Sequence, residues 1–219
     1  MGKKVNPIAL RLGTVFNWQS RWFNNRDYKG MVLEDYKLRE ALMKRLATAG
    51  VARVEIERSI NSMKLLLFVS RPGMVIGRAG TGLEDLKKYV VSLLAEISPK
   101  KTGKNAPKID IRVEAIKEPN LDAYLVAKNI SEQLAKRLPF KRVLNQNAER
   151  VMAAGAKGVK IGLAGRIAGS EIGRKEKIQM GTVPLSTIRE PVQYASVPSL
   201  TKKGYIGVKV WINTGEKNA

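Results

Sequence analysis

The sequence of 219 residues contains neither cysteine nor histidine. This absence excludes thiolate nucleophiles, disulfides, Cys/His zinc sites and every mechanism with histidine as the general base. The sequence has no run of about 18 apolar residues, so we expect no membrane span. It has no apolar signal region near its start, which argues against secretion. Chemistry by carboxylates or lysines stays open, but we expect no metal, no cofactor and no small-molecule substrate.

Negative charge is also scarce, with 19 Asp and Glu against 40 Lys and Arg, a net charge of +21. Hydrophobic residues make up 44% of the chain, enough for a folded core, so this is not the charge of a disordered tail. A folded protein with such an excess is expected to bind a polyanion, either nucleic acid or an anionic membrane surface. The expected amphipathic helices have aliphatic rather than aromatic apolar faces, which favours nucleic acid.

The basic excess is unevenly spread along the sequence. Residues 1–30 contain six basic residues and one acidic residue, and residues 119–219 contain 17 and seven. Residues 31–100 contain 12 basic and eight acidic residues, which is nearly ordinary. We therefore expect the main nucleic-acid anchors in the first and last segments.

Hydrophobic periodicity predicts a compact unit in the middle of the chain. The expected order is helix, strand, strand, short helix, helix, strand. The ranges are a helix at 33–49, strands around 54–56 and at 63–70, a helix at 82–97 and a strand at 109–113.

The sharpest local motif is a G-x-x-G turn between the short helix and the long helix of this unit. Glycines let two backbones approach closely, and the following helix presents free N–H groups to a phosphate. Set in this element order, the turn matches the single-strand-binding loop of a type II KH domain, with Arg78 on phosphate and Ile76 beneath the bases. A plain helix–helix turn is the alternative, and phosphate-loop or dinucleotide spacings are absent. The expected RNA-binding loop residues are Ile76, Gly77, Arg78, Ala79 and Gly80.

A second unit is predicted after Pro119-Asn120. Helices at 121–138 and 140–154 precede strands at 158–164, around 177–184, around 190–196 and at 204–212. Helices followed by strands indicate an α+β domain, here a two-layer arrangement of two helices on a mostly antiparallel sheet. The predicted organisation is a basic N-terminal arm at 1–30, a type II KH domain at 31–118, this domain at 119–212 and a tail at 213–219.

Two basic segments stand out in the second unit. Four cations surround Pro139, and they are either RNA contacts or a solvated corner between helices. The stretch 158–177 interleaves cations with glycines, which favours close contact with an RNA backbone over a flexible hairpin. Glu171 and Glu176 there are better explained as solvated ion pairs than as a catalytic pair. The aromatic residues near Arg21 and Arg26 either stack on bases or pack the arm onto the body. They are Trp18, Trp22, Phe23 and Tyr28.

Five separated motifs occur in order at 2–13, 75–80, 155–172, 181–185 and 204–212. Together they resemble the bacterial-type family of the third protein of the small ribosomal subunit. The match runs in one register from residue 2 to about residue 216, so we expect no presequence.

The resemblance implies a non-enzymatic structural protein in the head of the small subunit of a bacterial-type, cytoplasmic ribosome. Its expected partners are small-subunit rRNA, mRNA and neighbouring head proteins. The residues that would line the channel where mRNA enters, and assist unwinding of structured message, are Lys141, Arg142 and Asn145. The family pattern is basic where this chain has Asn145, which bears on the strength of unwinding rather than on placement. The expected rRNA contacts are Lys3, Lys4, Arg11, Lys136, Arg137, Lys157, Lys160, Arg166, Arg174, Lys175 and Lys177.

Two other functions are weighed against this hypothesis. A free-standing KH regulator or RNA chaperone would need neither the basic arm nor the Gly/Arg-rich stretch. A lysine-dependent lyase acting on damaged DNA would need one lysine with a lowered pKa, and none stands out by sequence.

Overall fold

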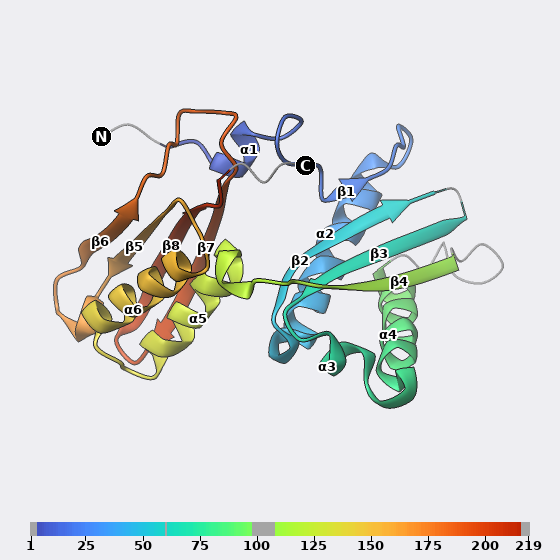
Figure 1. Cartoon of the computed structure of the whole chain (residues 1–219). Helices are drawn as coiled ribbons and strands as arrows, with labels where there is room; N and C mark the ends of the chain where they lie inside the picture. The colour runs from blue at the N-terminus through green and yellow to red at the C-terminus, as the bar shows by residue number, and fades with distance from the viewer. Residues whose placement is uncertain (1–3, 60, 98–107, 216–219) are drawn as a thin grey trace. The chain divides into compact units, whose positions relative to one another are not determined.

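The computed structural model describes residues 4–59, 61–97 and 108–215 (Figure 1). It divides into two compact units, Trp18–Lys117 and the combination of Met1–Asn17 with Glu118–Ala219. The predicted arm at 1–30 is thus shared between the units, with the division between Asn17 and Trp18. Lys3 and the end of the predicted tail lie outside the described residues.

The described part of the unit Trp18–Lys117 contains three α-helices and a four-stranded sheet in the order β1-β2-β3-β4. β2 and β3 are antiparallel, whereas β1 runs parallel to β2 and β4 parallel to β3. The predicted helix–strand order and the α+β class are confirmed, although the first helix begins five residues earlier than predicted. The elements are β1 (Ser20–Arg21), α2 (Tyr28–Arg45), β2 (Val51–Arg58), β3 (Ser62–Val69), α3 (Pro72–Ile76), α4 (Thr81–Ile97) and β4 (Lys108–Ala115).

The core of this unit follows the two periodicities of its sequence. Leu38 and Leu42 are buried on one face of α2, and Leu86 and Val90 are buried on α4. Along β3, alternate residues from Met63 to Val69 are buried, because successive strand side chains point to opposite faces. The helices therefore pack on one face of the sheet and fix the turn between α3 and α4.

The second unit has two helices packed on a four-stranded antiparallel sheet of order β6-β5-β8-β7. α5 packs against β7 and β8, while α6 packs against β5 and β6 (Figure 1). The predicted strand around 177–184 lies earlier in the chain, because Gly181 (φ 68°) turns the backbone where that strand ends. The elements are α1 (Pro7–Leu10), α5 (Ala123–Ala135), α6 (Phe140–Ala153), β5 (Gly158–Gly165), β6 (Arg174–Gly181), β7 (Val192–Thr201) and β8 (Gly204–Asn213).

The N-terminal segment belongs to this second unit through one buried side chain. α1 lies against β7, and Arg11, which follows α1, is fully buried. Its guanidinium donates to the carbonyl oxygen of Glu190 at 2.7 Å and to that of Pro7 at 3.1 Å. It also donates to the carbonyl oxygens of Pro184, Leu185 and Thr187 at 3.0, 3.2 and 2.8 Å. The expectation that Arg11 contacts rRNA does not fit this geometry, because its donors are directed into the protein.

Among the described residues, no helix is long and apolar enough to cross a membrane. Nor do the described residues bring three or more Asp or Glu side chains together in a way that would hold a metal ion.

Candidate nucleic-acid interface

The turn between α3 and α4 has the backbone shape that its glycines predict. Gly77 has φ 70° and ψ −177°, and Gly80 has φ 84°. A Cβ on Gly77 would lie 2.9 Å from the backbone nitrogen of Gly82, so the turn admits no side chain there. Ala79 is also left-handed at φ 51°, and Thr81 Oγ1 donates to the carbonyl oxygen of Arg78 at 3.0 Å. These constraints hold the loop in one shape and leave the Arg78 side chain exposed.

Gly82, which the G-x-x-G motif does not include, is the most tightly packed glycine of the turn. A Cβ there would lie 2.6 Å from the carbonyl oxygen of Val75. The absence of a side chain therefore lets α4 begin directly against the end of α3. In the sequence, the feature that could have indicated this close approach is the third glycine, two positions after Gly80.

The α3–α4 loop carries the Arg78 charge and lies beside both the N-terminus of α4 and the exposed apolar side chains of α3. α4 begins at Thr81, so its first N–H groups and its positive dipole end adjoin the loop. Met74 and Ile76 of α3 expose 55% and 38% of their surfaces beside it. This arrangement suits a strand that offers phosphates to Arg78 and the helix end, and base faces to the apolar side chains.

A second basic surface lies where α5 ends and α6 begins. Lys136 and Arg137 follow α5, and Lys141 and Arg142 lie in the first turn of α6, all four with exposed side chains. Arg137 adopts φ 62°, which turns the chain sharply between the helices. Asn145 is exposed one turn further along α6. The structure therefore brings these five predicted residues to one corner of the unit.

The corner is held by a buried amide on the inner side of α6. Asn147 is 2% exposed and donates to the carbonyl oxygen of Val143 at 2.7 Å and to Gln133 Oε1 at 2.9 Å. It also accepts a hydrogen bond from Asn129 Nδ2 at 3.3 Å. Because Gln133 and Asn129 belong to α5, these bonds fix α6 against α5 and so fix the direction of the basic side chains.

The cations predicted between Lys157 and Lys177 do not form one patch. Arg166 Nε donates to the carbonyl oxygen of Ser170 at 2.8 Å, and Lys157 Nζ lies 3.8 Å from Glu190 Oε1. Arg174 lies 3.6 Å from Glu176, which supports the ion-pair interpretation of that glutamate. The remaining cations, Lys160, Lys175 and Lys177, alternate on β5 and β6 with residues that face the helices.

The comparisons with known proteins agree with both units. A family model described as the C-terminal domain of ribosomal protein S3 matches residues 130–212, and a KH domain model matches residues 37–121. Small ribosomal subunit protein uS3 of Bacillus cytotoxicus is 44% identical over 216 residues, which cover 99% of this chain and 94% of that protein. The uS3 proteins of Bacillus thuringiensis and Bacillus cereus show the same identity and coverage.

The chain belongs to the uS3 family of small ribosomal subunit proteins. The resemblance drawn from five sequence motifs is confirmed, as is the α+β fold with an N-terminal KH domain. A uS3 protein is a ribosomal protein and not an enzyme, so the lysine-dependent lyase is set aside.

Of the four aromatic residues near Arg21 and Arg26, Trp22 is held by contacts within the protein. Trp22 Nε1 donates to Asp35 at 2.8 Å, and its ring lies 5.5 Å from that of Tyr28. Asp35 also pairs with Arg58, whose Nη1 lies 2.7 Å from Glu34. This buried charge cluster ties α2 to β2 and confirms packing rather than base stacking for Trp22. Trp18 and Phe23 remain exposed, at 63% and 87%.

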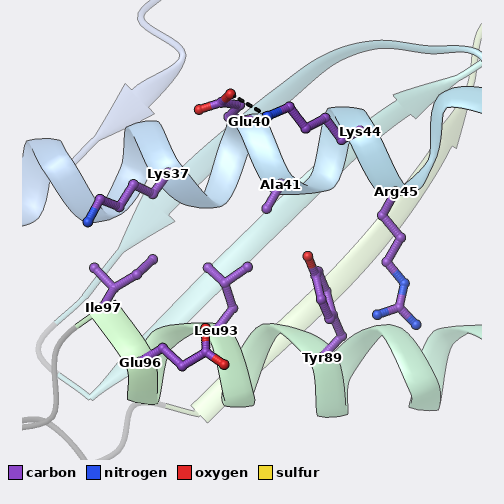
Figure 2. Close-up of a pocket in the computed structure, with 9 residues that line it drawn as sticks. All are labelled: Lys37, Glu40, Ala41, Lys44, Arg45, Tyr89, Leu93, Glu96 and Ile97. Carbon is purple, nitrogen blue, oxygen red and sulfur yellow. Dashed lines mark ion pairs between the residues drawn. The ribbon is translucent and has the colours of Figure 1, made fainter.

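A hollow of about 770 Å³ lies between α2 and α4 of the KH unit (Figure 2). Its charges are mixed and partly satisfied, since Lys44 Nζ lies 2.7 Å from Glu40 and the Arg45 guanidinium lies 4.1 Å from the centre of the Tyr89 ring. The hollow is open, and it lacks the uncompensated positive charge of the two basic surfaces. Its lining residues are Lys37, Glu40, Ala41, Lys44, Arg45, Tyr89, Leu93, Glu96 and Ile97.

Proposed function

We propose that this member of the uS3 family binds rRNA in the head of the small ribosomal subunit and holds mRNA where it enters. The general role follows from the family: the protein is an RNA-binding structural constituent of the small subunit of a bacterial-type, cytoplasmic ribosome. The observation that supports the proposed mRNA contact is the exposed basic corner between α5 and α6, held in place by Asn147.

Lys141 and Arg142 would contact the mRNA backbone. Both project from the first turn of α6, where the free backbone N–H groups and the positive helix end add to their attraction for phosphate. Asn145 lies on the same helix and can donate hydrogen bonds, but it releases no counterions on binding. We therefore propose that Lys141 and Arg142 supply the charge at this site and that Asn145 positions the mRNA through hydrogen bonds.

Replacing Lys141 and Arg142 with alanine tests this assignment. We expect assembly into small subunits to be intact, because both side chains are exposed, and translation through a structured message to slow several-fold. The matched control is Lys202→Ala with Lys203→Ala, which removes the same charge from the exposed β7–β8 turn. Passage through a stable message hairpin at the normal rate would refute the assignment.

The α3–α4 loop would bind a single strand in the manner of other KH domains. Arg78 is exposed on a backbone fixed by Gly77 and Gly82, so its charge is presented without reorganisation of the loop. We expect Arg78→Asp to weaken binding of a short single-stranded RNA roughly tenfold at moderate salt, since one phosphate contact is replaced by repulsion. Lys88→Asp, an exposed change on α4, is the control for net charge. Equal affinity in the two variants would show that the loop is not used.

The rRNA contacts are proposed for the cations of the second unit that the sequence analysis assigned to rRNA, apart from the buried Arg11. Lys3 is part of the sequence-based expectation but lies outside the described residues. Cosedimentation with small subunits after a high-salt wash tests the whole proposal, and a chain found wholly free of subunits would overturn it. The described residues of this set are Lys4, Lys136, Arg137, Lys157, Lys160, Arg166, Arg174, Lys175 and Lys177.

Neighbouring proteins of the head complete the proposed set of partners. The outer side of α2 exposes an aromatic and aliphatic stripe formed by Tyr28, Val32 and Tyr36, at 64%, 40% and 62%. Such a stripe fits the apolar surface of another folded protein better than a phosphate backbone.

A further inference from the structure

The sheet of the second unit has one face that α5 and α6 leave uncovered. Its strand register decides which residues share that face. Ile161 of β5 pairs with Ile178 of β6 and with Val210 of β8, and these side chains belong to the core beneath the helices. The residues that alternate with them, beginning with Lys160, therefore point away from α5 and α6.

Aromatic rings and lysines are interleaved on this open face. Lys160 is directly opposite Trp211, with its Nζ 5.7 Å from the centre of the indole ring. The Trp211 ring lies 5.3 Å from the ring of Tyr194 on β7. Lys177 and Lys209 occupy the neighbouring positions on either side of Gly162, and both are exposed.

The sheet surface beside these side chains is formed by small residues. Small residues occupy three open-face positions of β5 and β8, namely Gly162, Ala164 and Gly207. On β8, Gly207 is next to the open-face residue Tyr205, which is 68% exposed. A Cβ on Gly207 would approach nothing closer than 3.7 Å, so packing within the protein does not require glycine there. The small residues leave room for a flat group to lie against the sheet.

The positive charge of this face is not neutralised within the sheet. In the four strands, all of which are described, the sole acidic residue is Glu176, which pairs with Leu163 and lies on the helix side. Burial, and then repulsion by Lys4 and Lys177, lower the pKa of Lys160. Lys4 of the N-terminal segment and Lys177 of β6 thus both repel the charge of Lys160, and a bound anion would reduce this repulsion.

We propose that this face is a platform for single-stranded RNA, with bases stacked on the Trp211–Tyr194 pair and phosphates held by Lys160, Lys177 and Lys209. The proposal rests on the proposed RNA-binding function and extends it to residues that the sequence motifs did not assign, above all Trp211, Tyr194 and Lys209. A single strand is favoured because its base faces are free to stack on aromatic rings, whereas a duplex offers only its backbone and groove edges.

The intrinsic fluorescence of Trp211 gives a local test. The chain has three tryptophans, so the full chain carrying Trp18→Phe and Trp22→Phe reports from Trp211 alone. We expect a ten-nucleotide single-stranded oligouridylate to quench this fluorescence, and a duplex RNA at the same phosphate concentration to quench it much less. RNA binding with no change in Trp211 fluorescence would overturn the proposal.

A pair of charge reversals gives a second test that does not depend on tryptophan. Lys177→Glu with Lys209→Glu changes two exposed side chains, and filter binding measures the affinity of the otherwise unaltered full chain. We expect a loss of roughly tenfold or more for single strands at 0.15 M salt, and a salt slope smaller by about 1.4 for two lost phosphate contacts. The matched control, Lys202→Glu with Lys203→Glu, changes the charge equally at the far hairpin.

The outcomes separate the platform from the wider function. Equal binding by the platform variant and its control would overturn the platform, and so would equal losses for single strand and duplex. Loss of association with small subunits while single-strand affinity is kept would mean that these lysines contact structured rRNA or an acidic protein instead, and would also overturn it. The proposed function has its own test, because Lys141→Ala with Arg142→Ala and Arg78→Asp leave this face unaltered.

Discussion

At the scale of single residues, basic side chains in this protein differ greatly in what they do. Arg142 is exposed, whereas Arg11 is fully buried and donates hydrogen bonds to backbone carbonyls of the 184–190 loop and of α1. Burial lowers the pKa of Arg11, and the nearby Glu190 carboxylate partly opposes this shift. A count of cations in the sequence cannot separate the two cases, because four of the five carbonyls that Arg11 binds lie more than 170 positions away.

Arg11→Lys tests the structural role of that side chain. Lysine keeps the charge but cannot reach carbonyls on both sides of the site, so several buried acceptors lose their donor. We expect the second unit to lose about 2–4 kcal/mol of unfolding free energy, the scale for leaving buried polar groups unsatisfied. Urea unfolding followed by Trp211 fluorescence measures the change. Arg150→Lys, on the exposed side of α6, is the control and should change stability by no more than about 0.5 kcal/mol.

Lys160 is expected to oppose stability at neutral pH. Its pKa is lowered in the folded state, so the charged form is disfavoured by folding. The resulting destabilisation is full below the folded pKa and fades as pH rises from that value toward the ordinary lysine value. We therefore expect Lys160→Met to raise the melting temperature at pH 7, with a smaller gain near pH 10.5. A melting temperature lowered at pH 7, or a gain that grows with pH, would contradict this account.

At the scale of elements, local sequence decides the long periodic segments, and tertiary contacts decide their ends. α4 and β3 follow from their apolar spacing alone. α2 begins at Tyr28 rather than near residue 33, because the Trp22 indole donates a hydrogen bond to Asp35 and its ring packs at a tilt against the ring of Tyr28. β6 ends at Gly181, and the next segment lies around the Arg11 side chain. No local pattern contains these contacts, since their partners are distant or on other elements.

The same distinction applies to the candidate sites. The α3–α4 loop was predictable because Gly77, Arg78 and Gly80 lie within four consecutive positions of the sequence. The open sheet face was not, since Lys160, Lys177 and Trp211 come from three strands and meet only through the register of the sheet. The backbone approach at Gly82 was hidden for a related reason: the carbonyl that forbids a side chain there belongs to Val75, across the turn.

Gly82→Ala should disrupt the junction between α3 and α4. The added Cβ would lie 2.6 Å from a backbone oxygen, so the two helices must separate. We expect a loss of about 2–3 kcal/mol in the KH unit, comparable to overpacking elsewhere, together with weaker single-strand binding. Gly73→Ala is the control, since a Cβ there meets nothing within 4 Å and should stabilise α3 by about 0.5–1 kcal/mol. Equal stability of the two variants by thermal melting would show that the turn can relax.

At the scale of the whole molecule, the charge is divided more evenly than the sequence segments suggest. Residues 1–17 and 118–219 together contain 20 basic and eight acidic residues, a net +12. Residues 18–117 contain 20 basic and 11 acidic residues, a net +9. The KH unit gains cations because part of the predicted arm belongs to it. Both units are therefore positive enough to bind RNA, one through a loop and the other through a helix corner and a sheet face.

The two units also have separate hydrophobic cores that share no residue. Leu67 is fully buried in the KH unit and Ile161 in the other, so truncation of either to alanine should cost about 2–5 kcal/mol in its own core. We expect urea unfolding in two transitions, with Leu67→Ala lowering the one reported by Trp18 and Trp22, and Ile161→Ala the one reported by Trp211. In the double variant the losses should add, because the sites share no partner. If each single variant shifted both transitions equally, the units would unfold as one cooperative body, and RNA held by one unit would then stabilise the other.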